Sequence, residues 1–422
     1  MVTSRSASPP VTGAVVSLVG ALIAIYLVSQ FLRNSIGVIA PNLAKEVGLS
    51  AGEIGLLSSA FFLAFAAVQL PLGMAIDRFG PKTCLLVCAT ITILGCGLFA
   101  TATSPAGLIV ARVLLGLGSC SSFMAPLAIY ARRFSPHRFA TLTGLQLGLG
   151  SFGTLFATAP LAYAAAMFGW RATFLGVGVV TSLIAFLVAA VVDDGPGEGA
   201  ARSRPESWHE SLAGVAAVLR TPSVGHLFLV HLTGYSSFAL IAGLWGGPYL
   251  THVYGYGLQA RGDFLFVAAL AQILGSLAWG LSDRVFGSHK VPVLLGASFT
   301  AIALAAIALV GTLPPAMLFV WFATFGFLCA YTPVMIAHGR SLFPAHRVGR
   351  GMTVLNMGTM GGVFLVQTVS GLLIDLFPAL NGVYPLAAYR LVFGLQAGMV
   401  LVSALIYLGA RDPMLKKKAN SE

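Results

Sequence analysis

Charged residues are scarce in this sequence. They make up only 9% of the 422 residues, whereas a soluble domain carries about 25%. Hydrophobic residues account for 57% of the chain, and its mean hydropathy is +0.90. This composition excludes an ordinary soluble domain and predicts a polytopic membrane protein.

Acidic residues are fewer still, 13 against 24 Lys and Arg, which gives a formal net charge of +11. With twelve spans and both termini in the cytoplasm, 18 of the 24 basic residues fall in cytoplasmic segments. This distribution follows the positive-inside rule and does not form a nucleic-acid-binding patch. We therefore expect cytoplasmic termini, a bacterial inner membrane and no nucleic-acid partner.

Several chemical signatures are missing. The sequence has no catalytic constellation, no phosphate-binding glycine loop of the nucleotide-hydrolase type and no paired Cys/His metal spacing. We therefore expect neither an enzyme nor a primary pump, and neither a cofactor nor a metal. The cysteines fall inside expected helices and are interpreted as small buried residues: Cys84, Cys88, Cys96, Cys120 and Cys329.

Long apolar runs dominate the rest of the sequence, and each can cross about 30 Å of hydrocarbon as a helix. We expect an all-α membrane protein of twelve transmembrane helices in two six-helix bundles. The expected spans are about 15–41, 53–76, 83–103, 107–131, 139–166, 172–192, 223–250, 262–282, 291–311, 315–340, 351–376 and 389–410.

These spans divide the chain into five parts. Residues 14–192 form the expected N-terminal bundle, and residues 223–411 form the C-terminal bundle. The polar stretch 193–222 is the expected cytoplasmic linker, with a surface helix over about 206–219. Residues 1–13 and the basic residues 412–422 are expected cytoplasmic tails.

An internal repeat supports two related halves. The stretch Gly73–Lys82 contains an Asp-Arg pair between glycines, and Gly280–Lys290 repeats it more weakly about 206 residues later. Gln146 matches Asn356 at an offset of 210. Two repeated sequence features at nearly equal offsets predict two bundles related by an axis along the membrane normal.

The first loop, 73–82, resembles the loop signature of the major facilitator superfamily. The stretches 112–118 and 169–174 are similar to two further motifs of that family. The resemblance covers nearly the whole chain. It implies a secondary transporter that works by alternating access, with its site at mid-membrane between the halves, and we expect a monomer.

Residues 26–80 resemble more closely the anion:cation symporters of that superfamily. The shared features are an arginine near the middle of the first span, Arg33, placed 44 residues before Asp77, together with Pro41. The resemblance implies Arg112 as a second arginine in the substrate region. Leu32 stands where those symporters usually have an acidic residue.

Arg33 and Arg112 are the only full charges expected deep in the membrane. Burial of an unpaired guanidinium in hydrocarbon costs about 3 kcal/mol or more, and no carboxylate is expected at matching depth. Asp375, for example, lies near the outer end of its span. Two cations facing a cavity would form an anion site, since the substrate supplies the missing charge. The alternatives are that Arg33 extends to the outer surface and that Arg112 braces neighbouring helices through backbone carbonyls.

Other polar residues inside the spans are candidates for substrate contact or for interhelical hydrogen bonds. They are Gln30, Asn34, Gln146, Asn356 and Gln367, of which Gln146 and Asn356 are favoured because the repeat places them at equivalent depth. Trp245, beside Gly246-Gly247-Pro248, is a further candidate and lies at an expected helix break. That break predicts an outer gate, unless the aromatic residue is only an interfacial anchor.

His231 is the best protonatable candidate within the membrane, because no carboxylate is expected at that depth. It would either carry a coupling proton or pack as a neutral side chain.

The two repeated loops predict gates. Asp77 is expected to cap the cytoplasmic end of the span 351–376, beside Arg78, and to pair with Arg132 or Arg133, which would hold the inner side closed. The weaker copy contributes Asp283 and Arg284. The alternative for both loops is a topology anchor.

The favoured function is transport of a small organic anion, such as a carboxylate, together with a proton or cation. An efflux antiporter for lipophilic compounds is the alternative, and a membrane receptor or scaffold is a third class.

Overall fold

The computed structural model describes residues 13–193, 208–344 and 347–414. Within these ranges the chain is almost entirely helical, with a single isolated bridge between Leu380 and Val383. The expected tail 1–13, most of the linker and most of the tail 412–422 lie outside the described residues. The expected surface helix is present as α11, Trp208–Leu219.

The helices of the first half are α1 (Gly13–Asn34), α2 (Ile36–Val47), α3 (Ala51–Ala67), α4 (Gln69–Phe79), α5 (Pro81–Thr101), α6 (Pro105–Ser119), α7 (Ser121–Arg133), α8 (Pro136–Gly150), α9 (Phe152–Phe156) and α10 (Ala159–Val191). Those of the second half are α12 (Val224–Leu240), the π-helix η1 (Ile241–Trp245), α13 (Gly246–Tyr254), α14 (Leu258–Phe286), α15 (Lys290–Val310), α16 (Pro315–Leu328), α17 (Thr332–Leu342), α18 (Val348–Asp375) and α19 (Leu386–Tyr407).

These helices account for twelve spans. In the described residues ten helical segments are long and apolar enough to cross a membrane, and the bent pair α3 and α4 raises the number to 11. The remaining span is the interrupted segment of α8, α9 and the start of α10. Gly169 turns the chain inside α10, with φ of 79°, so this continuous helix contains parts of two spans. The all-α fold in two six-helix bundles is confirmed.

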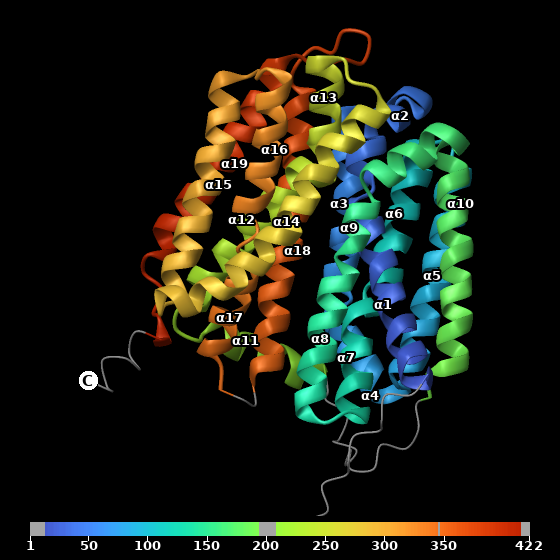
Figure 1. The fold of residues 1–422 in the computed structure, drawn as a ribbon, viewed down its shortest axis with the longest axis vertical. Helices are drawn as coiled ribbons and strands as arrows, with labels where there is room; N and C mark the ends of the chain where they lie inside the picture. Colours follow the sequence, from blue (N-terminus) through green and yellow to red (C-terminus); the bar gives the residue numbers. More distant parts are fainter. Residues whose placement is uncertain (1–12, 194–207, 345–346, 415–422) are drawn as a thin grey trace, which may run out of the picture.

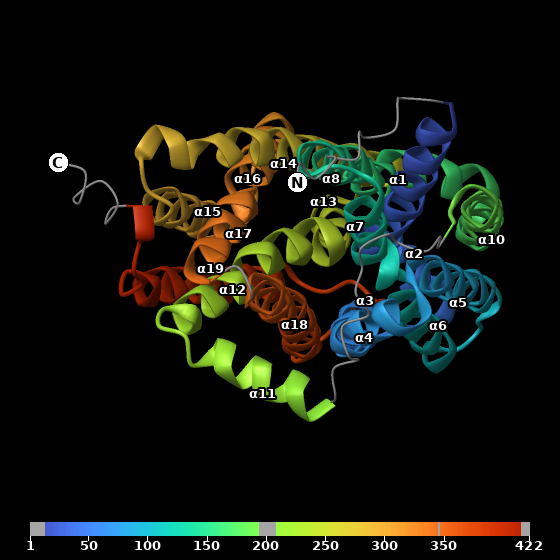
Figure 2. The ribbon, with the colours of Figure 1, turned by 90° about the horizontal axis from the view of Figure 1, so that it is seen from below.

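The two halves lie side by side (Figure 1). Helices of the first half, blue to green, form one bundle, and helices of the second half, yellow to red, form the other. We call the end near α2 and α13 the upper end and the end near α4 and α17 the lower end. Seen from the lower end, α11 lies outside the second bundle, beside α18 (Figure 2).

Two arginines show the repeat in three dimensions. Arg171, just after the turn in α10, donates to the carbonyl oxygens of Ala100 and Ala102 at 2.8 and 2.7 Å. Arg390 on α19 donates to those of Ala308 and Leu309 at 2.6 and 3.0 Å. In each bundle a cation on the sixth span therefore caps the carbonyl end of the third, where the helix dipole is negative.

The bundles meet most tightly at the upper end. The backbones of Gly37 on α2 and Gly247 on α13 approach so closely that a Cβ on Gly247 would overlap the Gly37 carbonyl. A Cβ on Gly55 of α3 would lie 3.0 Å from the Cα of Gly371 on α18. Glycine is required at such contacts because no side chain fits between the two backbones.

Five hydrogen bonds join the two bundles in the upper half of the described structure. Arg261 on α14 donates to Asn42 Oδ1 on α2 at 2.6 Å. Thr368 Oγ1 on α18 donates to Ser59 Oγ on α3 at 2.8 Å. The remaining bonds join Asp375 and Tyr384 to the start of α3. The upper end of the molecule is therefore closed.

Candidate functional site

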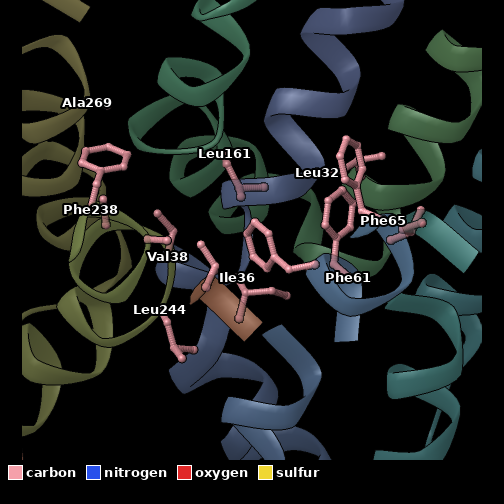
Figure 3. Close-up of a cluster of buried hydrophobic side chains, with 14 of the residues drawn as sticks. Leu32, Ile36, Val38, Phe61, Phe65, Leu161, Phe238, Leu244 and Ala269 are labelled. Atoms are coloured by element: carbon pink, nitrogen blue, oxygen red, sulfur yellow. The ribbon is translucent and has the colours of Figure 1, made fainter. Parts of the chain in front are cut away.

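The site lies where α1 gives way to α2, between the two bundles. Apolar side chains of both halves surround this level, including Leu32, Phe61 and Phe65 of the first half and Phe238 and Leu244 of the second (Figure 3). Such an apolar lining excludes water, so each polar group within it has a large energetic effect.

Arg33 lies in the last turn of α1 and is 8% exposed. Its guanidinium carbon lies 4.9 Å from the centre of the Phe65 ring, an energetically favourable cation–π contact. Among the described residues no acceptor lies within hydrogen-bond distance of the guanidinium, and neither ion pair of the structure includes it. Arg33 is thus a nearly buried cation that has an aromatic face but no counter-charge.

Arg112 on α6 is fully buried and has a different environment. Its three nitrogens donate to the backbone carbonyl oxygens of Leu32 at 2.7 Å, Leu57 at 3.2 Å and Ser58 at 3.4 Å. Its guanidinium carbon lies 4.8 Å from the centre of the Phe61 ring. In this conformation the side chain ties α6 to α1 and α3, which is the bracing arrangement named as the alternative above.

Asn34 lies beside Arg33 and is 2% exposed. Its Nδ2 donates to the Gln30 carbonyl at 3.0 Å and to Thr154 Oγ1 at 3.2 Å. Its Oδ1 is buried without a hydrogen-bond partner among the described residues. A buried acceptor without a donor costs free energy, so this atom is available to a donor from a ligand or water.

Gln367 on α18 brings the second bundle into the same site. Its Nε2 donates to the Ala239 carbonyl at 3.0 Å, while its buried Oε1 has no partner in the described chain. A Cβ on Gly243 of η1 would lie 3.6 Å from Gln367 Nε2 and 3.7 Å from Asn34 Oδ1. The two amides, one from each bundle, therefore both lie beside Gly243 of the π-helix. Gln367 was among the polar residues named in the spans, but it was not selected as a site residue because an interhelical hydrogen bond was the favoured role.

The remaining candidates for substrate contact lie elsewhere. Gln146 is buried, accepts from Tyr130 at 2.8 Å and donates to the Leu22 carbonyl at 2.9 Å, all within the first bundle. Asn356 on α18 is half-buried, and no described group hydrogen-bonds to its side chain. Trp245 ends η1, is 1% exposed, and donates to Ser370 Oγ at 2.7 Å. In this conformation these three residues do not join Arg33 and Asn34.

His231 on α12 is 2% exposed. Its Nδ1 lies 3.0 Å from Thr359 Oγ1 on α18, and its Nε2 has no partner among the described residues. The side chain is therefore enclosed and contacts α18 of its own bundle.

The predicted gate residues lie at the lower end. Asp77, Arg78 and Arg132 are exposed, and in the described chain no partner joins Asp77 to α18 or to Arg132. Asp283 pairs with His289 at 3.4 Å, and Arg284 is exposed. In the described chain these gate residues therefore do not join the two bundles, whereas hydrogen bonds join them at the upper end.

The sequence analysis also missed two hydrogen bonds that Glu46 accepts, one from an aromatic and one from a charged side chain. Glu46, near the end of α2, accepts from Trp170 Nε1 at 2.6 Å and from Arg171 Nε at 2.8 Å. These two bonds lower the pKa of the Glu46 carboxyl, the first having the larger effect. Glu46 therefore stabilises the first bundle and is not part of the central site.

Comparison with known proteins places the chain in a family of transporters. The profile described as Major Facilitator Superfamily matches residues 22–280 and again 227–422. The probable sulfoacetate transporter SauU of Cupriavidus necator is 26% identical over 281 residues, which are 64% of this chain and 65% of that one. The hexuronate transporter of Bacillus subtilis is 25% identical over 166 residues, 39% of each chain. The chain thus matches less than two thirds of the length of either relative.

A solved structure has the same fold. The bacterial homologue of the human lysosomal transporter Spinster, in an inward-facing and unoccupied conformation, superimposes with a TM-score of 0.77. The likeness covers 94% of this chain and 97% of that chain at 17% identity.

Proposed function

Because this chain belongs to the Major Facilitator Superfamily, and is a membrane transporter rather than an enzyme, we propose that it carries a small organic anion by alternating access, with Arg33 as the anion-binding group. The observation that carries this proposal is the Arg33 guanidinium, nearly buried and without a carboxylate partner in the described chain. A cation in this setting is stabilised when a substrate carboxylate or sulfonate forms the missing charge-assisted hydrogen bonds.

The two relatives support the anionic class. One is named as a transporter of sulfoacetate and the other as a transporter of hexuronate, and both compounds are acids. Asn34 Oδ1 and Gln367 Oε1 supply unpaired acceptors near the anion-binding group. They would accept from hydroxyl groups on the neutral part of the substrate, one from each bundle.

The lower end is the cytoplasmic end in this proposal. Exposed arginines concentrate there, including Arg78, Arg132, Arg284 and Arg340. By the positive-inside rule the structure then corresponds to a state closed to the outside. A bacterial inner membrane with cytoplasmic termini completes the proposed location. Asp77, Arg78, Arg132, Asp283 and Arg284 are the proposed inner gate, which would close when the outer side opens.

Ligand binding by purified protein tests the proposal. A thermal-shift screen with sulfoacetate, a hexuronate and small dicarboxylates should identify a ligand that raises the melting temperature, because a ligand that binds only the folded state stabilises it by mass action. Arg33→Ala should weaken binding about a hundredfold, since it removes about 3 kcal/mol of charge-assisted hydrogen bonding. Arg340→Ala, which removes an exposed arginine, is the matched control and should bind as the parent does.

Counterflow in proteoliposomes then tests transport. Flux of the identified acid that disappears in Arg33→Ala while the variant remains folded supports the proposal. Undiminished flux in that variant, or a broad preference for apolar compounds, would favour the antiporter alternative. Binding without any flux would favour a receptor.

His231 is proposed to carry a co-transported proton. Its buried position within the second bundle and its unpaired Nε2 support this role, since the described spans place no carboxylate beside it. His231→Gln should retain a hydrogen-bonding side chain toward Thr359 yet abolish the dependence of uptake on a proton gradient. Uptake by this variant that still follows the gradient would remove His231 from the coupling step.

A further inference from the structure

Asp375 ends α18 at the upper end of the molecule, an unfavourable place for an acid on its own helix. The carbonyl end of a helix has negative partial charge, so a carboxylate there is destabilised unless it has another partner. The structure supplies one from the other bundle. Asp375 Oδ1 accepts from the backbone N–H of Ala51 at 2.9 Å, and Oδ2 accepts from that of Gly52 at 2.7 Å.

These contacts complete the N-terminus of α3. Within the first bundle, Ser50 and Glu53 form a capping box: Glu53 accepts from the Ser50 N–H at 2.9 Å, and Ser50 Oγ accepts from the Glu53 N–H at 3.2 Å. The N–H groups of Ala51 and Gly52 have no such partner in their own bundle and bind Asp375 instead. Two of the first four N–H groups of α3 thus depend on the second bundle.

Tyr384, in the segment between α18 and α19, reinforces the contact. Its hydroxyl donates to Asp375 Oδ1 at 2.6 Å and accepts from the Ala51 N–H at 3.0 Å. Immediately below, Gly55 and Gly371 are in backbone contact, so the carboxylate lies at the tightest part of the α3–α18 interface.

At the lower end of α3–α4 and α18 the roles of the two bundles are reversed: the aspartate lies on the first bundle and the helix N-terminus on the second. Helices α3 and α4 descend while α18 rises, so Asp77 near the end of α4 is placed at the level where α18 begins. Asp77 is exposed and joined to no described group of α18 in this structure. Each end of the pair therefore has an aspartate at the C-terminus of one element, at the level of the N-terminus of the other.

We propose that Asp375, together with Tyr384, is an outer latch that holds the outside closed by capping α3, and that it alternates with Asp77 at the inside. This proposal rests on the alternating-access part of the proposed function, not on the anionic substrate. Opening of the outer side breaks the Asp375 bonds and returns the Ala51 and Gly52 N–H groups to water. Loss of either aspartate then shifts the population toward the state that the other one stabilises.

The test measures opening in the absence of any substrate. Ser59 is buried and bonded to Thr368 across the interface, so a cysteine at this position reports access from outside. The five native cysteines are buried. In the Ser59→Cys background, labelling by a membrane-impermeant maleimide should be about tenfold faster with Asp375→Asn than with Asp375.

Three variants complete the test. Glu53→Gln removes a carboxylate from the same helix end but only from the capping box of the first bundle, and should leave labelling within about twofold of the parent. Tyr384→Phe should increase the labelling rate less than Asp375→Asn does. It replaces Asp375→Asn in the test if that variant does not fold. Asp77→Asn should slow labelling, and combination with Asp375→Asn should bring it back toward the parent.

An unchanged labelling rate in both Asp375→Asn and Tyr384→Phe overturns the latch. An equal increase in Glu53→Gln also overturns it, because simple fraying of α3 would then explain the effect. Since no ligand is used, failure here is distinct from failure of Arg33→Ala to alter anion binding.

Discussion

Gly37 and Gly247 face each other across the two bundles in direct backbone contact. The contact lies one turn above Gly243, and therefore directly above the central site. Overpacking of a close contact costs about 1–3 kcal/mol, and here the neighbour is backbone, which cannot rotate away. The close contact of the bundles at the upper end thus depends on the absence of a side chain at this point.

Gly247→Ala should destabilise the closed outer end and reduce counterflow severalfold. The same Ser59→Cys labelling should become faster, because the bundles separate where the methyl group is inserted. Gly257→Ala is the matched control, since a Cβ at Gly257 meets nothing within 4 Å. Equal counterflow in the two variants would show that this contact is not part of the outer closure.

Arg112→Ala should lower the free energy of unfolding, and not only the affinity for the anion. It leaves the carbonyl oxygens of Leu32, Leu57 and Ser58 without this donor, a loss of about 3 kcal/mol in the free energy of unfolding. Thermal unfolding in detergent measures the effect, with Arg340→Ala as the control. A variant that keeps its stability but loses anion binding would instead identify Arg112 as a substrate ligand.

Glu46→Gln should give a pH-dependent loss of stability. The Trp170 and Arg171 bonds lower the pKa of Glu46 below its ordinary value of 4.5, so the carboxylate stabilises the folded state above that pH. The contribution is lost as the pH falls through the pKa of the folded state. Because the side chain is 47% exposed, we expect only about 1 kcal/mol, further reduced by salt.

Melting curves of the parent and Glu46→Gln at a series of pH values check this prediction. The two curves should be separated at pH 7 and converge under acid conditions. A separation that stays constant across the series would show that the charge of Glu46 does not contribute.

Arg171→Ala and Arg390→Ala should have similar effects, since each arginine caps the third span of its own bundle. We expect about 1–2 kcal/mol for each, with Arg171 the larger because it also pairs with Glu46. The two sites lie in different bundles, so their effects on the free energy of unfolding should add. A marked departure from additivity would indicate that the two arginine sites are energetically coupled.

Much of the fold could be predicted from apolar periodicity and length. The expected span 83–103 is the helix Pro81–Thr101, and the expected span 351–376 is Val348–Asp375. Two interruptions were not predicted: α1 stops before Ser35, and α3 stops before Val68. Breaks of this kind depend on which neighbours pack against the helix, and hydropathy does not contain that information.

The central site was predictable only in part. Arg33 and Asn34 could be selected because polar groups inside apolar runs are costly. Gln367 could not be ranked above other amides, because its proximity to Asn34 arises from the packing of residues far apart in sequence. In the sequence analysis Asp375 appeared only as an acid near the outer end of its span, too distant in depth to pair with Arg33 or Arg112. Its place at the C-terminal end of a helix, against the dipole, was the signal that it caps a different helix.

The π-helix η1 gives the seventh span a further property. Its wide turn holds one residue more than an α-helical turn, and a residue corresponds to about 100° of rotation and 1.5 Å of rise. Migration of this wide turn along the span would rotate the segment above it without breaking the backbone ladder as a whole. The part that carries Gly247 and Tyr249 would then turn as a unit about the level of Gly243, beside the two central amides.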